Sequence, residues 1–204
     1  MSRLLARFLT AVLVACALVA PLVFAGTYDV DRSHSSVVFS IRHFVSQVQG
    51  RFGEFQGALV YDEANPSASS VEFTVQTASI DTDNAKRDDH LRSTDFFDAE
   101  KNPTISFRST KVAADGKDGL LVTGDLTLKG VTKSVTVPVK VLGVMDAGKM
   151  GRRAGFAGTF TVNRKDYGIT WNRALDQGGF LLGDDVAITV NIEAAAKPAE
   201  AAAK

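Results

Sequence analysis

Apolar and polar residues alternate with a period of two over most of this 204-residue chain. Such an alternation is typical of a β-strand that buries one face and exposes the other to water. Strands of a parallel α/β sheet are instead apolar on both faces, so the pattern favours an antiparallel all-β fold. The alternation recurs in about eight segments, at residues 36–42, 54–61, 71–76, 104–110, 120–128, 131–141, 156–162 and 186–193.

Turn-forming residues separate these segments. They include Asn65-Pro66, Lys129-Gly130 and two Asp-Gly pairs within 114–119, and such pairs favour tight chain reversals. A sheet of about eight one-sided strands loses its exposed edges when it closes on itself. We therefore predict an all-β fold, an antiparallel β-barrel of about eight strands with a short helical insertion. A two-sheet sandwich is the alternative.

The helical insertion is predicted at residues 83–93, which are too charged to form a core helix. An aspartate or asparagine at 83–84 can cap its N-terminus. The few apolar side chains, Ala85 and Leu91, are expected to seat the helix on the barrel rim. The Phe96-Phe97 pair that follows would then fill this end of the barrel.

The first 25 residues have the form of an export signal. Arg3 and Arg7 precede an uncharged run at 8–25, and Ala25 ends a stretch that suits a signal peptidase. We predict that residues 1–25 are a signal peptide cleaved after Ala25. Two alternatives stay open: the segment is retained as a membrane anchor, or a lipid is attached at Cys16.

The rest of the chain is predicted to be one β domain at 26–194 with a disordered Ala/Lys tail at 195–204. Cys16 is the only cysteine, so a cleaved chain has neither disulfides nor thiol chemistry. Loss of Arg3 and Arg7 leaves 21 basic against 23 acidic side chains, a net charge of about −2. This balance gives no reason to expect nucleic acid or an anionic membrane as partner.

Chemistry-bearing motifs are weak. His34, His43 and His90 are widely spaced, which does not suggest a metal site, and no nucleotide-binding glycine loop or nucleophile elbow is present. We therefore predict a protein that is not an enzyme and has no cofactor. A lipid hydrolase or isomerase with His43 or His90 as acid/base is the remaining catalytic alternative.

About eight strands enclose an interior that side chains can fill or that can hold one ligand, and periodicity does not decide between the two. If the barrel is hollow, apolar inward residues would line it and cations near the helix would hold an anionic head group. An ordinary solvated surface, with these arginines paired to acidic neighbours, is the other interpretation. The candidate lining residues are Phe39, Phe73, Phe107, Phe156 and Phe160, and the candidate head-group residues are Arg42, Arg87 and Arg92.

Several blocks of sequence carry a resemblance to a known family. The most specific is His-Leu-Arg-Ser-Thr-Asp-Phe at 90–96, followed by Pro-Thr-Ile-Ser-Phe at 103–107. On these blocks the chain resembles the YceI-like family of exported lipid- or polyisoprenoid-binding proteins. The blocks are 28–31 with 34–35, 39–43 with 50–52, 87–96, 103–110, 124–133 and, more weakly, 156–169.

The resemblance implies an elongated, lipocalin-like antiparallel barrel with a helix near its mouth, located in the periplasm. It also implies a cavity for a long apolar chain, such as an isoprenoid or fatty-acid derivative, and no catalytic residues. The leading hypothesis is a periplasmic carrier of such a lipid. The alternative is a non-enzymatic stress-response interaction protein with a filled barrel. A homodimer is possible in either case, and residues 170–185 are expected to form a lid or a long loop.

Overall fold

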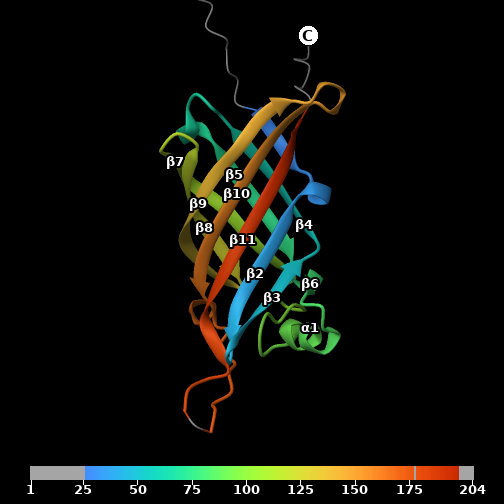
Figure 1. Ribbon diagram of the computed structural model, residues 1–204, viewed down its shortest axis with the longest axis vertical. Helices are drawn as coiled ribbons and strands as arrows, with labels where there is room; N and C mark the ends of the chain where they lie inside the picture. The colour runs from blue at the N-terminus through green and yellow to red at the C-terminus, as the bar shows by residue number, and fades with distance from the viewer. Residues whose placement is uncertain (1–25, 177, 198–204) are drawn as a thin grey trace, which may run out of the picture.

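The alternating segments pair into one antiparallel sheet that closes on itself (Figure 1). The closed ring has the order β1-β4-β5-β7-β8-β9-β10-β11, and β11 pairs back with β1. This computed structural model describes residues 26–176 and 178–197, so the predicted signal peptide at 1–25 lies outside the described residues. Within the described part, no helix has the length and apolar character needed to cross a membrane.

Eleven strands, one α-helix and five short 3-10 helices make up the described chain. The strands are β1 (Gly26–Val30), β2 (Ser36–His43), β3 (Ser46–Phe52), β4 (Phe55–Tyr61), β5 (Ser70–Gln76), β6 (Ile80–Asp81), β7 (Thr104–Asp115), β8 (Gly119–Leu128), β9 (Val131–Asp146), β10 (Arg152–Asn163) and β11 (Leu182–Ala196). The helices are α1 (Ala85–Arg92), η1 (Arg32–His34), η2 (Pro66–Ala68), η3 (Thr77–Ser79), η4 (Gly148–Met150) and η5 (Arg164–Tyr167).

Two sides of the barrel are built from broken strands. Strand β11 pairs with β2 between residues 182 and 191 and with β1 at residues 194–196. The short helix η1 joins β1 to β2. In the same way β4 pairs with β1 while β3 pairs with β2. On its other side β3 pairs only with the short β6, at Arg51 and Phe52. The first half of β3 therefore has no strand neighbour on that side among the described residues.

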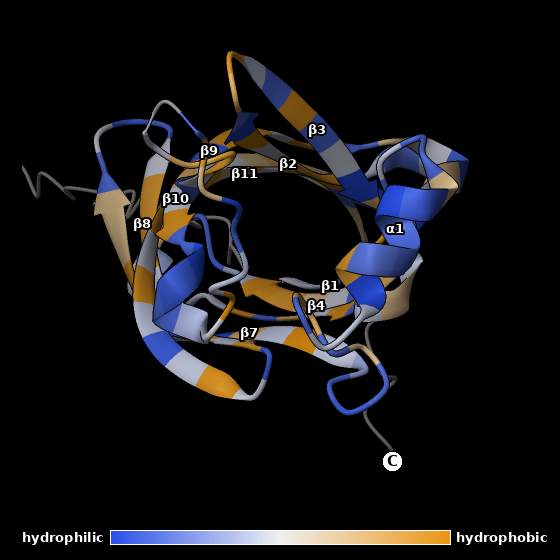
Figure 2. Ribbon diagram, turned by 90° about the horizontal axis from the view of Figure 1, so that it is seen from below, coloured by the Kyte–Doolittle hydropathy of each residue, from blue (hydrophilic) through white to orange (hydrophobic). Residues whose placement is uncertain are grey.

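Helix α1 lies at this open side, at one end of the barrel (Figure 2). Asn84 caps it by accepting a hydrogen bond from the Arg87 backbone N–H at 3.0 Å, as one of the two predicted caps. Leu91 packs on the core as expected, whereas Ala85 is exposed. The buried residue of the helix is instead Asp88, whose carboxylate accepts hydrogen bonds from the Thr82 N–H and hydroxyl. A polar contact, not an apolar one, thus holds the first turn.

The sequence prediction of the tail was wrong at its start. Strand β11 continues to Ala196, where Tyr28 of β1 pairs with Ala196, and Ala194 is fully buried. Alanine favours helices in isolation, but pairing on both sides overrides this preference, and small side chains fit beneath Tyr28. The remaining tail residues, 198–204, lie outside the described residues.

An ion-pair cluster closes the gap between β1 and β2. Asp31 accepts hydrogen bonds from the Ser33 N–H and from Arg153 at 2.9 Å, and it contacts His34 at 3.1 Å. Arg153 also reaches Glu193 at 3.4 Å. The cluster thus links η1 to β10 and β11. Hydrogen bonds from His34 and then Arg153 lower the pKa of Asp31 from 3.8 to about 2.

We expect this cluster to stabilise the protein above pH 4 and to lose its effect as the pH falls toward 2. A carboxylate with a lowered pKa in the folded state favours folding above its unfolded pKa and no longer does so below its folded pKa. Asp31→Asn should therefore lower stability at neutral pH and flatten the fall between about pH 4 and 2. Urea unfolding of both proteins across pH 2–7 measures this.

Asp81 and Asp184 also have lowered pKa values, because of the Asp83 N–H and Lys165 respectively. Only the difference between wild type and variant therefore isolates Asp31. Asp29→Asn is the matched control, since Asp29 forms an exposed pair with Lys197, and surface pairs contribute little. Parallel pH curves for wild type and Asp31→Asn would contradict the prediction.

Candidate ligand-binding cavity

The inward side chains of the barrel do not fill it. They enclose a cavity of about 430 Å³ that extends from Leu59 and Phe156 at one end to Leu91 and Trp171 near α1. This volume lies within the roughly 300–1,000 Å³ range of small-molecule pockets. The periodicity of the sequence did not decide whether the barrel is filled or hollow. The cavity shows that it is hollow.

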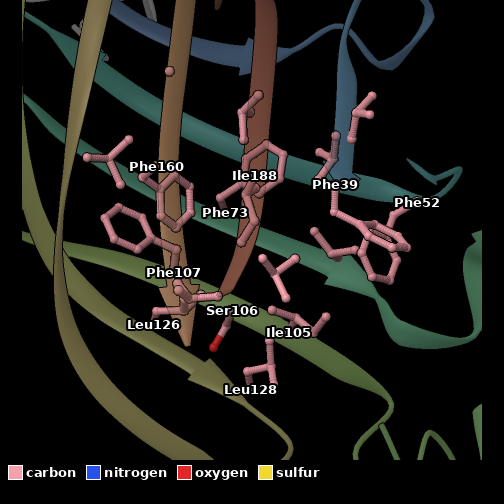
Figure 3. Close-up of a pocket in the computed structure, with 18 of the residues that line it drawn as sticks. Phe39, Phe52, Phe73, Ile105, Ser106, Phe107, Leu126, Leu128, Phe160 and Ile188 are labelled. Carbon is pink, nitrogen blue, oxygen red and sulfur yellow. The ribbon is translucent and has the colours of Figure 1, made fainter. Parts of the chain in front are cut away.

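All five predicted phenylalanines lie on the cavity wall. Figure 3 shows Phe39, Phe73, Phe107 and Phe160 projecting inward from four different strands. Alternation explains this placement, because each occupies the inward position of its strand. Phe156 lies further toward the end opposite α1, where its ring meets Tyr61 edge-on at a centroid distance of 5.2 Å. Whether these rings contact a ligand stays a prediction.

Only one of the three predicted head-group arginines borders the cavity. Arg87 lies on the wall, but Arg42 and Arg92 do not. Arg42 falls between the inward Ile41 and His43 of β2, so it points outward. Arg92 follows Arg87 by five residues, which turns it by roughly 140° around a helix of 3.6 residues per turn.

The guanidinium groups on α1 are mostly engaged with the protein itself. Arg87 donates from Nε to the Thr82 hydroxyl at 2.7 Å and from Nη2 to the Thr82 carbonyl at 2.8 Å. Arg92 donates to the carbonyls of Ala78 and Ile80, both at 2.8 Å. These contacts fasten α1 to the barrel, and the three arginines are not gathered around one anion site.

Three aromatic side chains pack together at the α1 end. His90 lies edge-on to Phe96 and to Trp171, with centroid distances of 5.0 and 4.9 Å. Phe96 and Trp171 are 5.3 Å apart, and all three line the cavity. His90 Nε2 also lies 2.9 Å from Asp95 Oδ2. This cluster, the mouth cluster, joins α1 to the segment between η5 and β11.

That segment, residues 170–181, forms a small hairpin. Asn172 pairs with both the N–H and the carbonyl of Leu182, and Ala174 bridges to Phe180. The hairpin projects beyond α1 at the lower end of the molecule (Figure 1). Of the predicted lid, Trp171, Leu181 and Leu182 reach the cavity.

Arg164 anchors the base of this hairpin. Its side chain is 3% exposed and donates to the carbonyls of Gly183, Ile169 and Trp171 at 2.7–2.8 Å. Burial lowers the pKa of Arg164, while Asp184 opposes the shift. In the sequence, Arg164 falls only within 156–169, the weakest block of the family resemblance. Its role depends on contacts made after folding.

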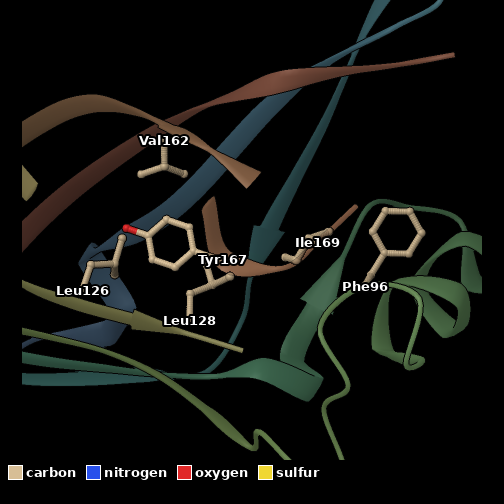
Figure 4. Packing of buried hydrophobic residues seen from close by; sticks show 6 residues of the cluster. All are labelled: Phe96, Leu126, Leu128, Val162, Tyr167 and Ile169. Carbon is tan, nitrogen blue, oxygen red and sulfur yellow. The ribbon is translucent and has the colours of Figure 1, made fainter. Parts of the chain in front are cut away.

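Tyr167 packs beside Arg164 in the core at this end. Figure 4 shows its ring between Leu126, Leu128 and Val162, with Phe96 on the side of α1. Burial, followed by the charge of Asp166, raises the pKa of Tyr167. The phenol is therefore neutral, and it borders the cavity.

The three histidines do not meet. His34 lies in η1, His43 at the end of β2 and His90 on α1. Within the described chain, the group that could place three metal-ligating atoms within 4.8 Å of one another is Asp31, His34 and Glu193. The Arg153 guanidinium already bonds to both of its carboxylates, so this group is an ion-pair cluster.

Comparison with known proteins identifies the family of this barrel. The YceI-like domain matches residues 28–194. A "UPF0312 protein" of Pseudomonas aeruginosa is 47% identical over 148 residues, which cover 71% of this chain and 77% of that protein. The chain belongs to the YceI-like family.

Solved structures of other proteins share the barrel. Burkholderia cenocepacia BcnA is 27% identical with a TM-score of 0.72, and the match covers 80% of this chain and 98% of that one. A structure described as a polyisoprenoid binding domain from Saccharophagus degradans is 15% identical with a TM-score of 0.62, covering 85% and 100%. At that identity the second likeness supports the fold alone. The lipocalin-like architecture predicted from the sequence is confirmed.

Proposed function

We propose that this YceI-like protein is a periplasmic carrier that binds a long-chain isoprenoid or other amphiphilic lipid inside its barrel. The observation that carries the proposal is the apolar cavity of about 430 Å³. Each buried CH₂ group contributes about 0.8 kcal/mol, so about ten such groups suffice for tight binding without specific polar contacts. The polyisoprenoid-binding description of the S. degradans relative agrees with this ligand class.

The proposal assigns binding without chemical change to the lipid. Along the chain, selectivity would be loose, because apolar contacts are not directional. For the head group, Arg87 is the one predicted arginine on the cavity wall among the described residues. Export to the periplasm rests on the N-terminal sequence, with its basic start and uncharged run.

Native mass spectrometry of the mature protein, purified from its own periplasm, tests the proposal. We expect a stoichiometric apolar ligand, which solvent extraction then identifies. An anionic head group would support contact with Arg87, and a neutral one would exclude a charge clamp. A ligand-free mass, together with no uptake of offered polyprenyl lipids, would contradict the carrier and favour a non-enzymatic interaction protein, although its barrel is hollow and not filled as that alternative assumed.

A further inference from the structure

Two apolar tips project at the α1 end of the barrel. One is the two-residue turn Phe44-Val45 between β2 and β3, and the other is Phe180 in the 170–181 hairpin. Their residues are 52%, 86% and 55% exposed, respectively. The Phe44 N–H donates to the Leu181 carbonyl at 2.7 Å, which holds the tips together. We call Phe44, Val45 and Phe180 the rim patch.

The turn keeps its phenylalanine in an unfavourable conformation. Phe44 has a φ of 52°, in the left-handed region, where glycine is the residue without a steric penalty. Its side chain is half exposed, so burial in the core does not compensate for this strain. A bulky apolar side chain is thus displayed to solvent at a cost in stability. An exposed apolar side chain held in a strained conformation marks a candidate contact surface.

The rim patch adjoins the cavity. His43, next to Phe44, and Leu181, next to Phe180, both line the cavity wall. The part of β3 that has no second strand neighbour in the described chain begins immediately after Val45. A lipid chain that enters or leaves the barrel at this end would therefore pass along apolar side chains.

Charge near the tips suits a phospholipid surface. Arg42 lies two residues before Phe44, and the described part of the hairpin contains Arg173 and one acidic residue, Asp176. Lys165 lies over the Phe180 ring, 5.9 Å from its centroid, and pairs with Asp184. In the two tips themselves, at 42–46 and in the described part of 170–181, Arg42 and Arg173 stand against Asp176, whereas Lys165 is offset by Asp184. Apolar side chains flanked by cations are typical of protein surfaces that enter the membrane interface.

We propose that the rim patch docks this protein on a phospholipid bilayer, with the α1 end of the cavity facing the membrane. The inference rests on the proposed function, because it assigns the site where the carried lipid is exchanged. The overall charge of the chain did not suggest a membrane partner. The local arrangement of apolar side chains in the two tips does suggest one.

The test compares the mature wild-type chain with two double variants. Phe44→Gly/Val45→Ser removes the turn's apolar side chains. Leu142→Ser/Met145→Ser is the matched control, since these residues of β9 are 60% and 66% exposed at the opposite end. Flotation with vesicles of phosphatidylglycerol and phosphatidylcholine measures docking. We expect about 10-fold weaker vesicle binding for the first variant and wild-type binding for the control.

A second measurement excludes a folding defect. Because glycine relieves the positive φ, Phe44→Gly alone should melt at a higher temperature than wild type, although it docks less well. Failure of wild type to float, or an equal loss in the control variant, would overturn the proposal. So would a concentration-dependent dimer that Phe44→Gly/Val45→Ser abolishes while vesicle binding is unchanged, since a second copy would then cover the patch.

The docking proposal and the carrier proposal can be tested separately. A polyprenyl lipid delivered from cyclodextrin, without vesicles, measures cavity binding alone. We expect Phe44→Gly/Val45→Ser to bind this lipid as wild type does, but to take it up more slowly from vesicles. If wild type binds no lipid from cyclodextrin, the carrier function is wrong, whatever flotation shows. If uptake from vesicles is equally fast in both proteins, the docking site is wrong.

Discussion

Ile188→Trp is expected to reduce affinity for long-chain lipids about 50-fold while the barrel stays folded. Ile188 lies on β11, where it pairs with Phe160 of β10 on one side and with Phe39 of β2 on the other. Figure 3 shows it among the inward rings. An indole at this position would occupy cavity space that the ligand needs. Displacing about three CH₂ groups, at about 0.8 kcal/mol each, gives this factor.

The variant should keep its fold because the added atoms enter an existing cavity. Overpacking is costly where the core is already dense, but the interior of this barrel contains a cavity. The matched control is Thr189→Trp, one residue further along β11. Thr189 faces outward, where its hydroxyl lies 3.3 Å from that of Thr159, so the control adds the same indole outside the barrel.

Isothermal titration with a polyprenyl lipid, and thermal melting of all three proteins, check this prediction. Equal affinities for Ile188→Trp and wild type would show that the lipid does not occupy the middle of the barrel. The carrier proposal would then lose the cavity on which it rests. Weakened binding in Thr189→Trp as well would point to a general disturbance of β11.

The barrel could be predicted because inward and outward positions alternate, and this pattern is local in the sequence. Where a glycine replaces an inward apolar residue, the pattern fades. Strand β3 was missed for this reason: the Phe39 ring covers Gly50, and a Cβ there would lie 2.4 Å from Phe39 Cζ. The β1 strand was missed as well, since only its pairing with β4 and β11 defines it.

The lining phenylalanines and the arginines differ in how far the sequence determines their place. A strand has two faces, so alternation alone places Phe73 or Phe107 inward. A helix has a full circle of directions, and Arg87 and Arg92 were grouped by nearness in sequence although their side chains diverge. The mouth cluster depends on a contact between His90 and Trp171. These residues are 81 positions apart in the sequence, so no local pattern reveals the contact.

Arg164→Met is expected to lower the free energy of unfolding by about 3 kcal/mol. Three backbone carbonyls, those of Ile169, Trp171 and Gly183, depend on its guanidinium for hydrogen bonds. The contact to Ile169 is buried and the other two are partly buried, and a buried acceptor left without a donor costs about 1–3 kcal/mol before the structure relaxes. Methionine preserves much of the apolar stem, so the loss reports on the hydrogen bonds.

Lys165→Met is the matched control. Lys165 also binds Asp184, at 2.8 Å, but its side chain is 44% exposed, and exposed pairs contribute about 0–1 kcal/mol. Urea unfolding should therefore separate the two variants by about 2 kcal/mol or more. Equal losses would mean that the pair with Asp184, and not the carbonyl contacts, anchors the hairpin.

Trp171 gives this prediction a local readout. It is the only tryptophan in the chain, and its carbonyl is one of the three that Arg164 holds. Loss of that contact should free the indole from His90 and Phe96 and shift its emission to longer wavelength in the folded state. A destabilised Arg164→Met with unchanged emission would place the effect elsewhere in the barrel. The hairpin that carries Phe180 would then not depend on Arg164 for its position beside the cavity.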